Sequence, residues 1–161
     1  MRLTKMIVGL ADAGVDFVLI GGLAAGVHGS TRVTFDLDIC YSPAPENRER
    51  LAALLTKWNA YLRGVESGLP FLMDARTLKD SRVLTLTTSL GDIDVMDAVD
   101  GVGLYADVAR QSVEAEFAGR RIRVIDLPAL LKAKRAARRP RDLEQIPELE
   151  ALLELRKKRK R

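Results

Sequence analysis

The sequence contains few residues that form covalent cross-links or aromatic cores. It has one cysteine, Cys40, among 161 residues, and only 5% of the chain is Phe, Trp or Tyr. A single cysteine excludes an internal disulfide and is typical of a reducing compartment. The scarcity of aromatic residues predicts a mainly aliphatic core, and the length predicts one domain.

Long apolar runs are also missing. No stretch approaches the roughly 20 apolar residues that a membrane span needs. Residues 1–22 are only superficially similar to a signal peptide, because Asp12 and Asp16 interrupt the apolar run and no small-residue cleavage site follows it. We therefore expect a cytoplasmic protein without a membrane partner.

The net charge of +4 is unevenly distributed along the chain. Residues 1–130 hold 14 Lys or Arg and 17 Asp or Glu, whereas residues 131–161 hold 12 and 5. The last six residues, 156–161, read RKKRKR. We expect one domain over residues 1–155, followed by a solvated and frayed basic tail over residues 156–161. If the partner is RNA, such a tail supplies non-specific, salt-sensitive affinity for phosphate.

Hydrophobic patterning predicts an α/β (α+β) fold with a mixed sheet flanked by helices. We expect helices over residues 2–13, 23–29, 46–62, 104–111, 128–137 and 141–155. We expect strands over residues 15–20, 31–41, 82–88, 92–99, 112–117 and 120–125. The last four strands form two hairpins, and residues 63–81, which show no clear period, are expected to be mostly loop.

Two pairs of aspartates carry the strongest chemical signal. Asp36 and Asp38 are two residues apart in a predicted strand, as are Asp92 and Asp94, so each pair projects from one face. A single D-x-D is more often an exposed polar face. If the two strands are neighbours, however, three or four carboxylates converge and require a divalent cation such as Mg²⁺ or Mn²⁺. A two-metal site of this kind serves phosphoryl or nucleotidyl transfer.

A glycine pair precedes the first aspartate pair. Gly21 and Gly22 follow a buried strand and precede a short helix, so their backbone N–H groups are free to face an anion. The surrounding residues match neither a Walker A loop nor a Rossmann fingerprint. Taken alone, two glycines after a strand are more often a turn than a phosphate site.

The order strand, Gly-Gly, helix, D-x-D and a later aspartate resembles the nucleotidyltransferase superfamily. The segments GGLAAGVHGSTRVTFDLDI and KRAARRPRDLEQI are similar to small bacterial AbiEii-like and DUF6036-like proteins and to minimal nucleotidyltransferases. Several of these belong to toxin–antitoxin systems. The resemblance covers residues 15–149 and implies the nucleotidyltransferase (polymerase-β-like) fold.

The resemblance also implies roles for the singled-out residues. The glycine pair would hold the triphosphate of an NTP such as ATP, and Asp36 and Asp38 would bind the metals. The third catalytic and metal-binding carboxylate would be Asp94, which fits the family's hydrophobic-Asp-hydrophobic motif better than Asp92.

Five further residues have two interpretations each. Arg32 alternates with the aspartates on the expected strand and would contact nucleotide phosphate or form a structural ion pair. Lys134 would contact phosphate and Asp142 would position that region, or the two are a cationic helix face and an N-cap. His28 is expected to be structural or to contact nucleotide rather than to act as a general base, and Cys40 is expected to be a small buried residue.

These observations predict a metal-dependent nucleotidyltransferase that moves NMP from an NTP to an acceptor hydroxyl. The short chain leaves little room for an acceptor domain, which favours an acceptor on a partner protein or RNA. One alternative is a catalytically silent, antitoxin-like binding protein, although three converging carboxylates argue against it. Another is an RNA-binding protein that uses the basic C-terminal helix.

Overall fold

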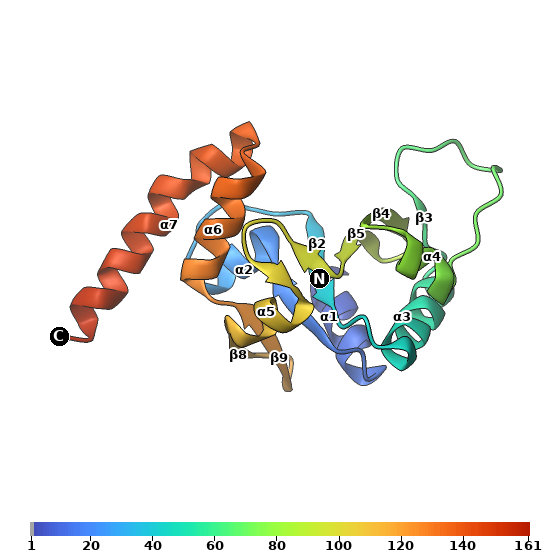
Figure 1. Ribbon diagram of the computed structural model, residues 1–161, viewed down its shortest axis with the longest axis horizontal. Helices are drawn as coiled ribbons and strands as arrows, with labels where there is room; N and C mark the ends of the chain where they lie inside the picture. Colours follow the sequence, from blue (N-terminus) through green and yellow to red (C-terminus); the bar gives the residue numbers. More distant parts are fainter. Residues whose placement is uncertain (1) are drawn as a thin grey trace.

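One mixed sheet of seven strands, in the order β3-β4-β5-β2-β1-β9-β8, organises the computed structural model, which describes residues 2–161 (Figure 1). A separate two-stranded ribbon is made by β6 and β7. The strands are β1 (Phe17–Ile20), β2 (Asp36–Tyr41), β3 (Tyr61–Leu62), β4 (Val83–Thr88), β5 (Gly91–Met96), β6 (Ala98–Val99), β7 (Gly103–Leu104), β8 (Ser112–Phe117) and β9 (Arg120–Ile125). The expected mixed sheet flanked by helices is therefore confirmed.

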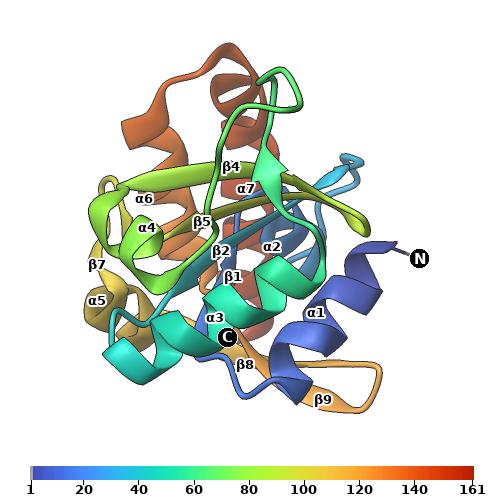
Figure 2. The same ribbon diagram turned by 90° about the vertical axis from the view of Figure 1, so that its right-hand side faces the viewer.

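Helices cover both faces of this sheet. They are α1 (Arg2–Asp12), α2 (Gly21–Val27), α3 (Pro45–Lys57), α4 (Ala75–Asp80), α5 (Tyr105–Arg110), α6 (Leu127–Ala137) and α7 (Pro140–Arg159). Figure 2 shows α1 and α3 in front of the sheet, with α2, α6 and α7 behind it. Among residues 2–161, no helix combines the length and apolar character that crossing a membrane requires.

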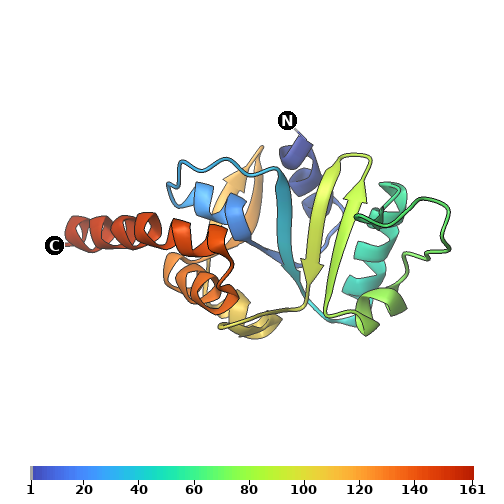
Figure 3. The ribbon, with the colours of Figure 1, turned by 90° about the horizontal axis from the view of Figure 1, so that it is seen from above.

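The core lies mainly between the sheet and the α1–α3 layer. Side chains of β4 alternate between exposed and buried. From Asp92 onward, those of β5 alternate between partly exposed and buried. Leu86, Ile93, Leu37 and Ile39 are fully buried on successive strands. Because side chains alternate across a strand, the residues between them face the opposite side, where α6 and α7 leave part of the sheet uncovered (Figure 3).

Two expected boundaries were wrong. The strand expected over residues 31–41 begins only at Asp36, because residues 30–32 are held by hydrogen bonds to α7 instead of to a neighbouring strand. The helix expected over residues 46–62 ends at Lys57. It stops there because Asn59 adopts a positive φ of 56°, and Tyr61 and Leu62 then pair with β4 as the edge strand β3.

Two other segments are more helical than expected. Within residues 63–81, Asp74 caps α4 by accepting a 2.8 Å hydrogen bond from the backbone N–H of Thr77. The basic run at the C-terminus was expected to be frayed, but α7 continues to Arg159. Arg156 donates a 3.3 Å hydrogen bond to the His28 carbonyl, and Lys157 pairs with Glu154 at 3.4 Å, which favours the helical conformation.

Candidate active site

The two aspartate pairs lie on neighbouring strands. Strands β2 and β5 are parallel and place Asp36 opposite Asp92 and Asp38 opposite Asp94. Strand β4 continues these rows, because Thr87 pairs with Asp92 and Thr85 pairs with Asp94. Two transverse rows of polar side chains therefore cross one face of the sheet, with the carboxylates on the two central strands.

Asp38 carries an unusual charge state because of this arrangement. Burial is the main cause that raises its pKa, and the charge of Asp94, a carboxyl hydrogen bond with Asp94 and the charge of Asp36 raise it further, to about 7. Lys134 opposes the shift only in part. Both burial and the neighbouring carboxylates therefore disfavour a negative charge on Asp38, and a bound cation would relieve that cost.

The glycine pair lies against these carboxylates. Gly21 has a φ of +69°, and a Cβ added to it would lie 2.2 Å from Asp38 Oδ2. A Cβ on Gly22 would lie 2.9 Å from Thr34 Oγ1. Only glycine permits both the left-handed backbone at residue 21 and the close approach of the chain to the Asp38 carboxylate. The two ends of the segment from Gly21 to Asp38 are thus in contact.

A cleft of about 520 Å³ opens over this face. Residues of β2, β4 and β5 line one wall, and residues of α6 and the first turns of α7 line the other. Its lining includes every residue predicted from the sequence to bind metal or nucleotide: Gly21, Gly22, Arg32, Asp36, Asp38, Asp94 and Lys134. Asp92 does not line it; its carboxylate accepts a 3.0 Å hydrogen bond from Thr87.

The helical wall contains a buried carboxylate that pairs with two cations. Asp142, which is fully buried, pairs through Oδ1 with Lys134 Nζ at 3.1 Å and through Oδ2 with Arg139 Nε at 2.7 Å. Burial raises the pKa of Asp142, but the hydrogen bonds from Arg139 and Lys134 outweigh it and the pKa is lowered overall. The N-cap interpretation of Asp142 was wrong, because the helix begins at Pro140 and Asp142 lies within its first turn.

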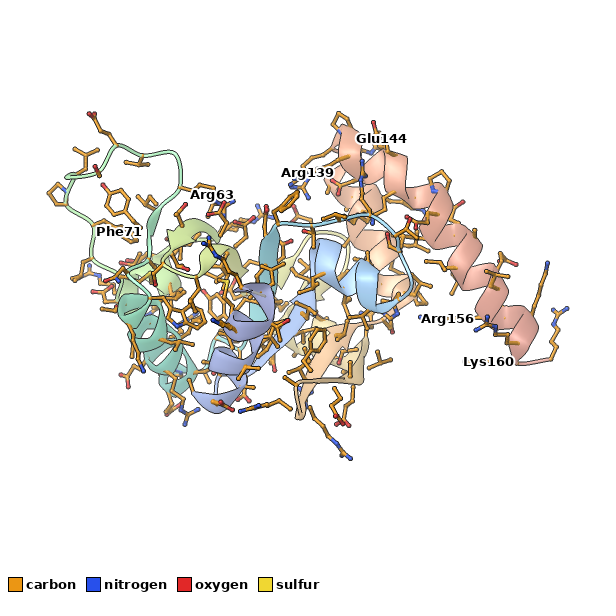
Figure 4. All side chains as sticks on the ribbon, turned by 180° about the vertical axis from the view of Figure 1, so that it is seen from behind. Arg63, Phe71, Arg139, Glu144, Arg156 and Lys160 are labelled. Carbon is orange, nitrogen blue, oxygen red and sulfur yellow. The ribbon has the colours of Figure 1, made fainter. Side chains whose placement is uncertain are left out.

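Arg32 reaches the cleft from outside the sheet. The expectation that it shares a strand face with the aspartates was wrong, because β2 begins four residues later. Its guanidinium donates to the Arg141 carbonyl at 2.7 Å and pairs with Glu144 at 2.8 Å, so it ties the segment before β2 to α7. Figure 4 shows Glu144 on α7 and Arg139 near the start of that helix.

Sequence reasoning missed Arg63. Its Nη2 lies 2.9 Å from Asp94 Oδ1, and its Nε lies 3.3 Å from Asp92 Oδ2. Nη2 also donates a 2.8 Å hydrogen bond to the Leu86 carbonyl. Arg63 follows a strand of only two residues in a segment without hydrophobic periodicity, so no local sequence signal pointed to it.

The chain's single histidine, His28, and single cysteine, Cys40, are structural. His28 is buried, and its Nε2 lies 2.6 Å from the Ile125 carbonyl oxygen. Burial lowers the pKa of His28 and therefore favours the neutral ring. Cys40 is fully buried, which raises the pKa of its thiol to about 12. Neither residue lines the cleft.

The carboxylates of Asp36, Asp38 and Asp94 offer oxygen ligands for a divalent cation. Within residues 2–161, no three side chains of His, Cys, Asp or Glu are arranged as a ready metal site. The donor set nevertheless fits a hard cation, since Asp38 and Asp94 face one another and Asp36 lies one pleat away. In addition, Asp94 Oδ1 is buried and receives no hydrogen bond from any described residue, since the Arg63 contact is an ion pair without hydrogen-bond geometry.

Several solved structures are similar to this chain. LnuA, a lincosamide antibiotic adenylyltransferase solved with lincomycin bound, has a TM-score of 0.63 at 14% identity, covering 94% of this chain and 96% of LnuA. ANT(2'')-Ia in complex with adenylyl-2''-tobramycin has a TM-score of 0.56 at 16% identity, covering all of both chains. TM1012 of Thermotoga maritima, a candidate nucleotidyltransferase, has a TM-score of 0.53 at 15% identity, covering 96% of this chain and 92% of TM1012.

Sequence comparison gives no corresponding relative: neither a protein-family model nor a curated protein matches the chain significantly. The structural matches extend over nearly the whole length of each partner, so they concern the complete arrangement of sheet and helices. At identities of 14–16% such matches report the fold and leave the activity to separate evidence. The chain therefore has the nucleotidyltransferase (polymerase-β-like) fold.

Proposed function

We propose that this protein is a metal-dependent nucleotidyltransferase that transfers NMP from an NTP to an acceptor hydroxyl. The observation that carries the proposal is the in-register pairing of Asp38 with Asp94 directly beside the Gly21 backbone, inside one cleft. Carboxylates suited to a divalent cation and a glycine backbone suited to an anion therefore line one cleft.

In this proposal the carboxylates of Asp36, Asp38 and Asp94 hold Mg²⁺ or Mn²⁺. A bound metal would neutralise the charge that develops as the acceptor oxygen attacks the α-phosphorus and pyrophosphate leaves. Gly21 and Gly22 bind the triphosphate through their backbone. The protein's own contribution is mainly positioning, because the fixed strands hold donor and acceptor groups in one geometry.

Lys134 is the proposed phosphate contact on the helical wall. Asp142 holds its ammonium group at 3.1 Å, and the Lys134 side chain retains 10% of its exposure at the edge of the cleft. A cation held in this way is oriented before the nucleotide arrives, which lowers the entropy lost on binding. Arg32, fixed to α7 at the cleft mouth, supplies a second cation for the nucleotide.

Two classes of acceptor follow from different observations. The family resemblance makes a hydroxyl on a partner protein or an RNA, including a partner in a toxin–antitoxin system, the first candidate. However, LnuA and ANT(2'')-Ia are matched along almost their entire chains, and their structures contain lincomycin and adenylyl-2''-tobramycin. The length therefore does not exclude an acceptor of antibiotic size, and a hydroxylated small molecule is the second candidate.

A second candidate function, RNA binding, rests on the C-terminal end of α7. The four residues from Arg156 to Arg159 form the last turn of this helix, and Figure 4 shows Arg156 and Lys160 far from Arg63 and the sheet. A projecting basic helix end supplies phosphate affinity that falls steeply with salt. In this case the aspartates would be structural, and the protein would bind RNA without transferring nucleotide.

One experiment separates these proposals. The protein is incubated with Mg²⁺ and each α-labelled NTP, together with total tRNA, cell lysate, or a panel of aminoglycosides and lincosamides. We expect label on one acceptor class and none with the Asp36→Ala/Asp38→Ala double variant. Transfer that survives in the double variant contradicts the proposal. If no transfer occurs and the protein binds RNA in a salt-sensitive way that is lost when residues 156–161 are deleted, the RNA-binding function is favoured. If no transfer occurs and the protein binds only another protein, the catalytically silent binding role is favoured.

A further inference from the structure

We infer that Arg63 is a positioning residue that fixes the Asp94 carboxylate for divalent-cation binding. The inference rests on the proposed function, and it concerns a side chain to which the family resemblance assigns no role. Arg63 does not line the cleft. It lies behind Asp94, on the side away from Asp38, and acts through the carboxylate rather than on a substrate.

The sheet register places Arg63 in line with the carboxylates. Asp38 on β2 pairs with Asp94 on β5, and Asp94 pairs with Thr85 on β4. The backbone N–H of Arg63 donates to the Thr85 carbonyl at 3.0 Å, which extends this transverse row to a fourth strand. The guanidinium then crosses over Thr85 to reach Asp94 Oδ1 at 2.9 Å.

Three contacts hold the guanidinium in one orientation. Nη2 donates to the Leu86 carbonyl at 2.8 Å and faces Asp94, while Nε faces Asp92 Oδ2 at 3.3 Å. The side chain of Arg63 is 25% exposed and that of Asp94 is 18% exposed, so the pair is largely shielded from water. A planar guanidinium fixed at several points fixes the direction of the carboxylate that it faces.

This arrangement has a consequence for Asp94 that Asp36 does not share. Arg63 Nη2 faces Asp94 Oδ1 at 2.9 Å from the side of β4, whereas Asp38 lies on the opposite side, on β2. The positive charge of Arg63 also offsets the repulsion between the Asp38 and Asp94 carboxylates, which are neighbours on the parallel strands β2 and β5. Outer partners that orient metal-ligating carboxylates typically contribute 10–100-fold to metal affinity or activity.

The test is Mn²⁺ binding to the protein, measured from the electron paramagnetic resonance signal of free Mn²⁺. The variants are Arg63→Gln, Arg63→Lys and Asp94→Asn. We expect Arg63→Gln to raise the Kd for Mn²⁺ by about tenfold or more. Arg63→Lys keeps the charge but not the planar fork, so we expect an intermediate Kd.

Arg76→Gln is the matched control, because it removes one arginine charge from an ion pair whose arginine side chain is 87% exposed. Thermal unfolding of every variant shows that the Kd values refer to folded protein. An Arg63→Gln Kd within about twofold of that of the Arg76→Gln control overturns the inference, and so does tighter Mn²⁺ binding, which would mean that Arg63 competes with the metal.

The Asp94→Asn arm separates this inference from the proposed function. If Asp94→Asn abolishes Mn²⁺ binding and Arg63→Gln does not affect it, Arg63 has no positioning role and the metal site stands. If Asp94→Asn binds Mn²⁺ as wild type does, the proposed metal site itself is wrong. Weaker binding in both variants, with Arg63→Lys between Arg63→Gln and wild type, supports both.

Discussion

The Lys134–Asp142–Arg139 network and the Asp36–Asp38–Asp94 group line the same cleft, and they handle buried charge in opposite ways. In the first, a fully buried carboxylate has two cationic partners, and its pKa is lowered. In the second, burial and neighbouring carboxylates raise the pKa of Asp38 to about 7.

This difference indicates what each wall contributes. A paired buried charge holds α6 against α7 because the loss of either partner leaves an uncompensated charge. A group of mutually repelling carboxylates stabilises nothing in the free protein. Such a group persists where it serves binding or catalysis at a cost in stability. The buried network of the helical wall therefore stabilises the fold while it holds Lys134 at the cleft, whereas the carboxylates of the sheet wall serve ligand binding at a cost in stability.

The largest expected effect is on catalysis. Asp38→Asn and Asp94→Asn each remove a proposed metal ligand, and we expect nucleotidyl transfer to fall about 10³-fold or more, equivalent to about 4 kcal/mol of transition-state stabilisation. Label transfer from an α-labelled NTP measures the loss. Asp92→Asn is the comparison and should lose less activity than either variant, because Asp92 does not line the cleft and reaches Asp94 only through Arg63. Equal losses in all three variants would contradict the assignment of Asp94.

The next effect is on stability and concerns the helical wall. Asp142→Ala leaves Lys134 buried without its partner, so we expect the free energy of unfolding in urea to fall by about 3–5 kcal/mol. Glu150→Ala is the control, since it breaks the exposed Arg135–Glu150 ion pair between the same two helices, at an expected cost below about 1 kcal/mol. Similar losses in both variants would show that the buried network is not what holds the helices together.

A comparison of two glycine variants tests the contact between Gly21 and Asp38, the two ends of the segment that joins the glycine pair to the aspartates. Gly21→Ala requires an alanine at a φ of +69° with its Cβ against Asp38 Oδ2, so we expect a loss of about 2–4 kcal/mol. Gly26 lies in the same helix with no atom within 4 Å of an added Cβ. We expect Gly26→Ala to be neutral or to stabilise by up to about 1 kcal/mol. Urea unfolding of both variants checks this; a smaller loss for Gly21→Ala than for Gly26→Ala would refute it.

The smallest expected effect is a gain in folding stability instead of a loss. Because the pKa of Asp38 in the folded protein is about 7, above the ordinary aspartate value of 3.8, ionising this residue destabilises the fold. Wild-type stability relative to Asp38→Asn is therefore greatest below about pH 4 and is lost as the pH rises through about 7. At about pH 8 we expect Asp38→Asn to be more stable than wild type by about 1–2 kcal/mol, since the charge is shared with Asp94.

Thermal unfolding of wild type and Asp38→Asn across this pH range measures the effect. The same variant that loses transfer should thus gain stability at alkaline pH. A variant that is less stable than wild type at every pH would show that Asp38 is a structural residue.

Much of this architecture could be predicted because its signals are local. The period of two in both aspartate pairs placed each pair on one face, and Gly91 and Gly119 marked hairpin turns that the structure confirms. The position of Asp94 beside Asp38 followed from the order of the elements together with the family resemblance.

The missed features depend on contacts distant in sequence. Arg63 reaches Asp94 only because a two-residue strand pairs with β4, and two residues cannot carry a recognisable period. The segment before β2 alternates like a strand, but its polar groups bond to Glu148 and neighbouring residues of α7 more than a hundred positions away. Tertiary contacts of this kind override local propensity.

The central claim is that Asp38 and Asp94 share a divalent cation in the cleft. It is tested most directly by a crystal structure grown with Mn²⁺ and a non-hydrolysable NTP analogue, with diffraction recorded at the manganese absorption edge. We expect an anomalous peak between the Asp38 and Asp94 carboxylates, with Asp36 turned toward it and the phosphates of the analogue at Gly21 and Gly22. An analogue bound with no anomalous peak at these carboxylates, or with manganese held elsewhere, would contradict the account.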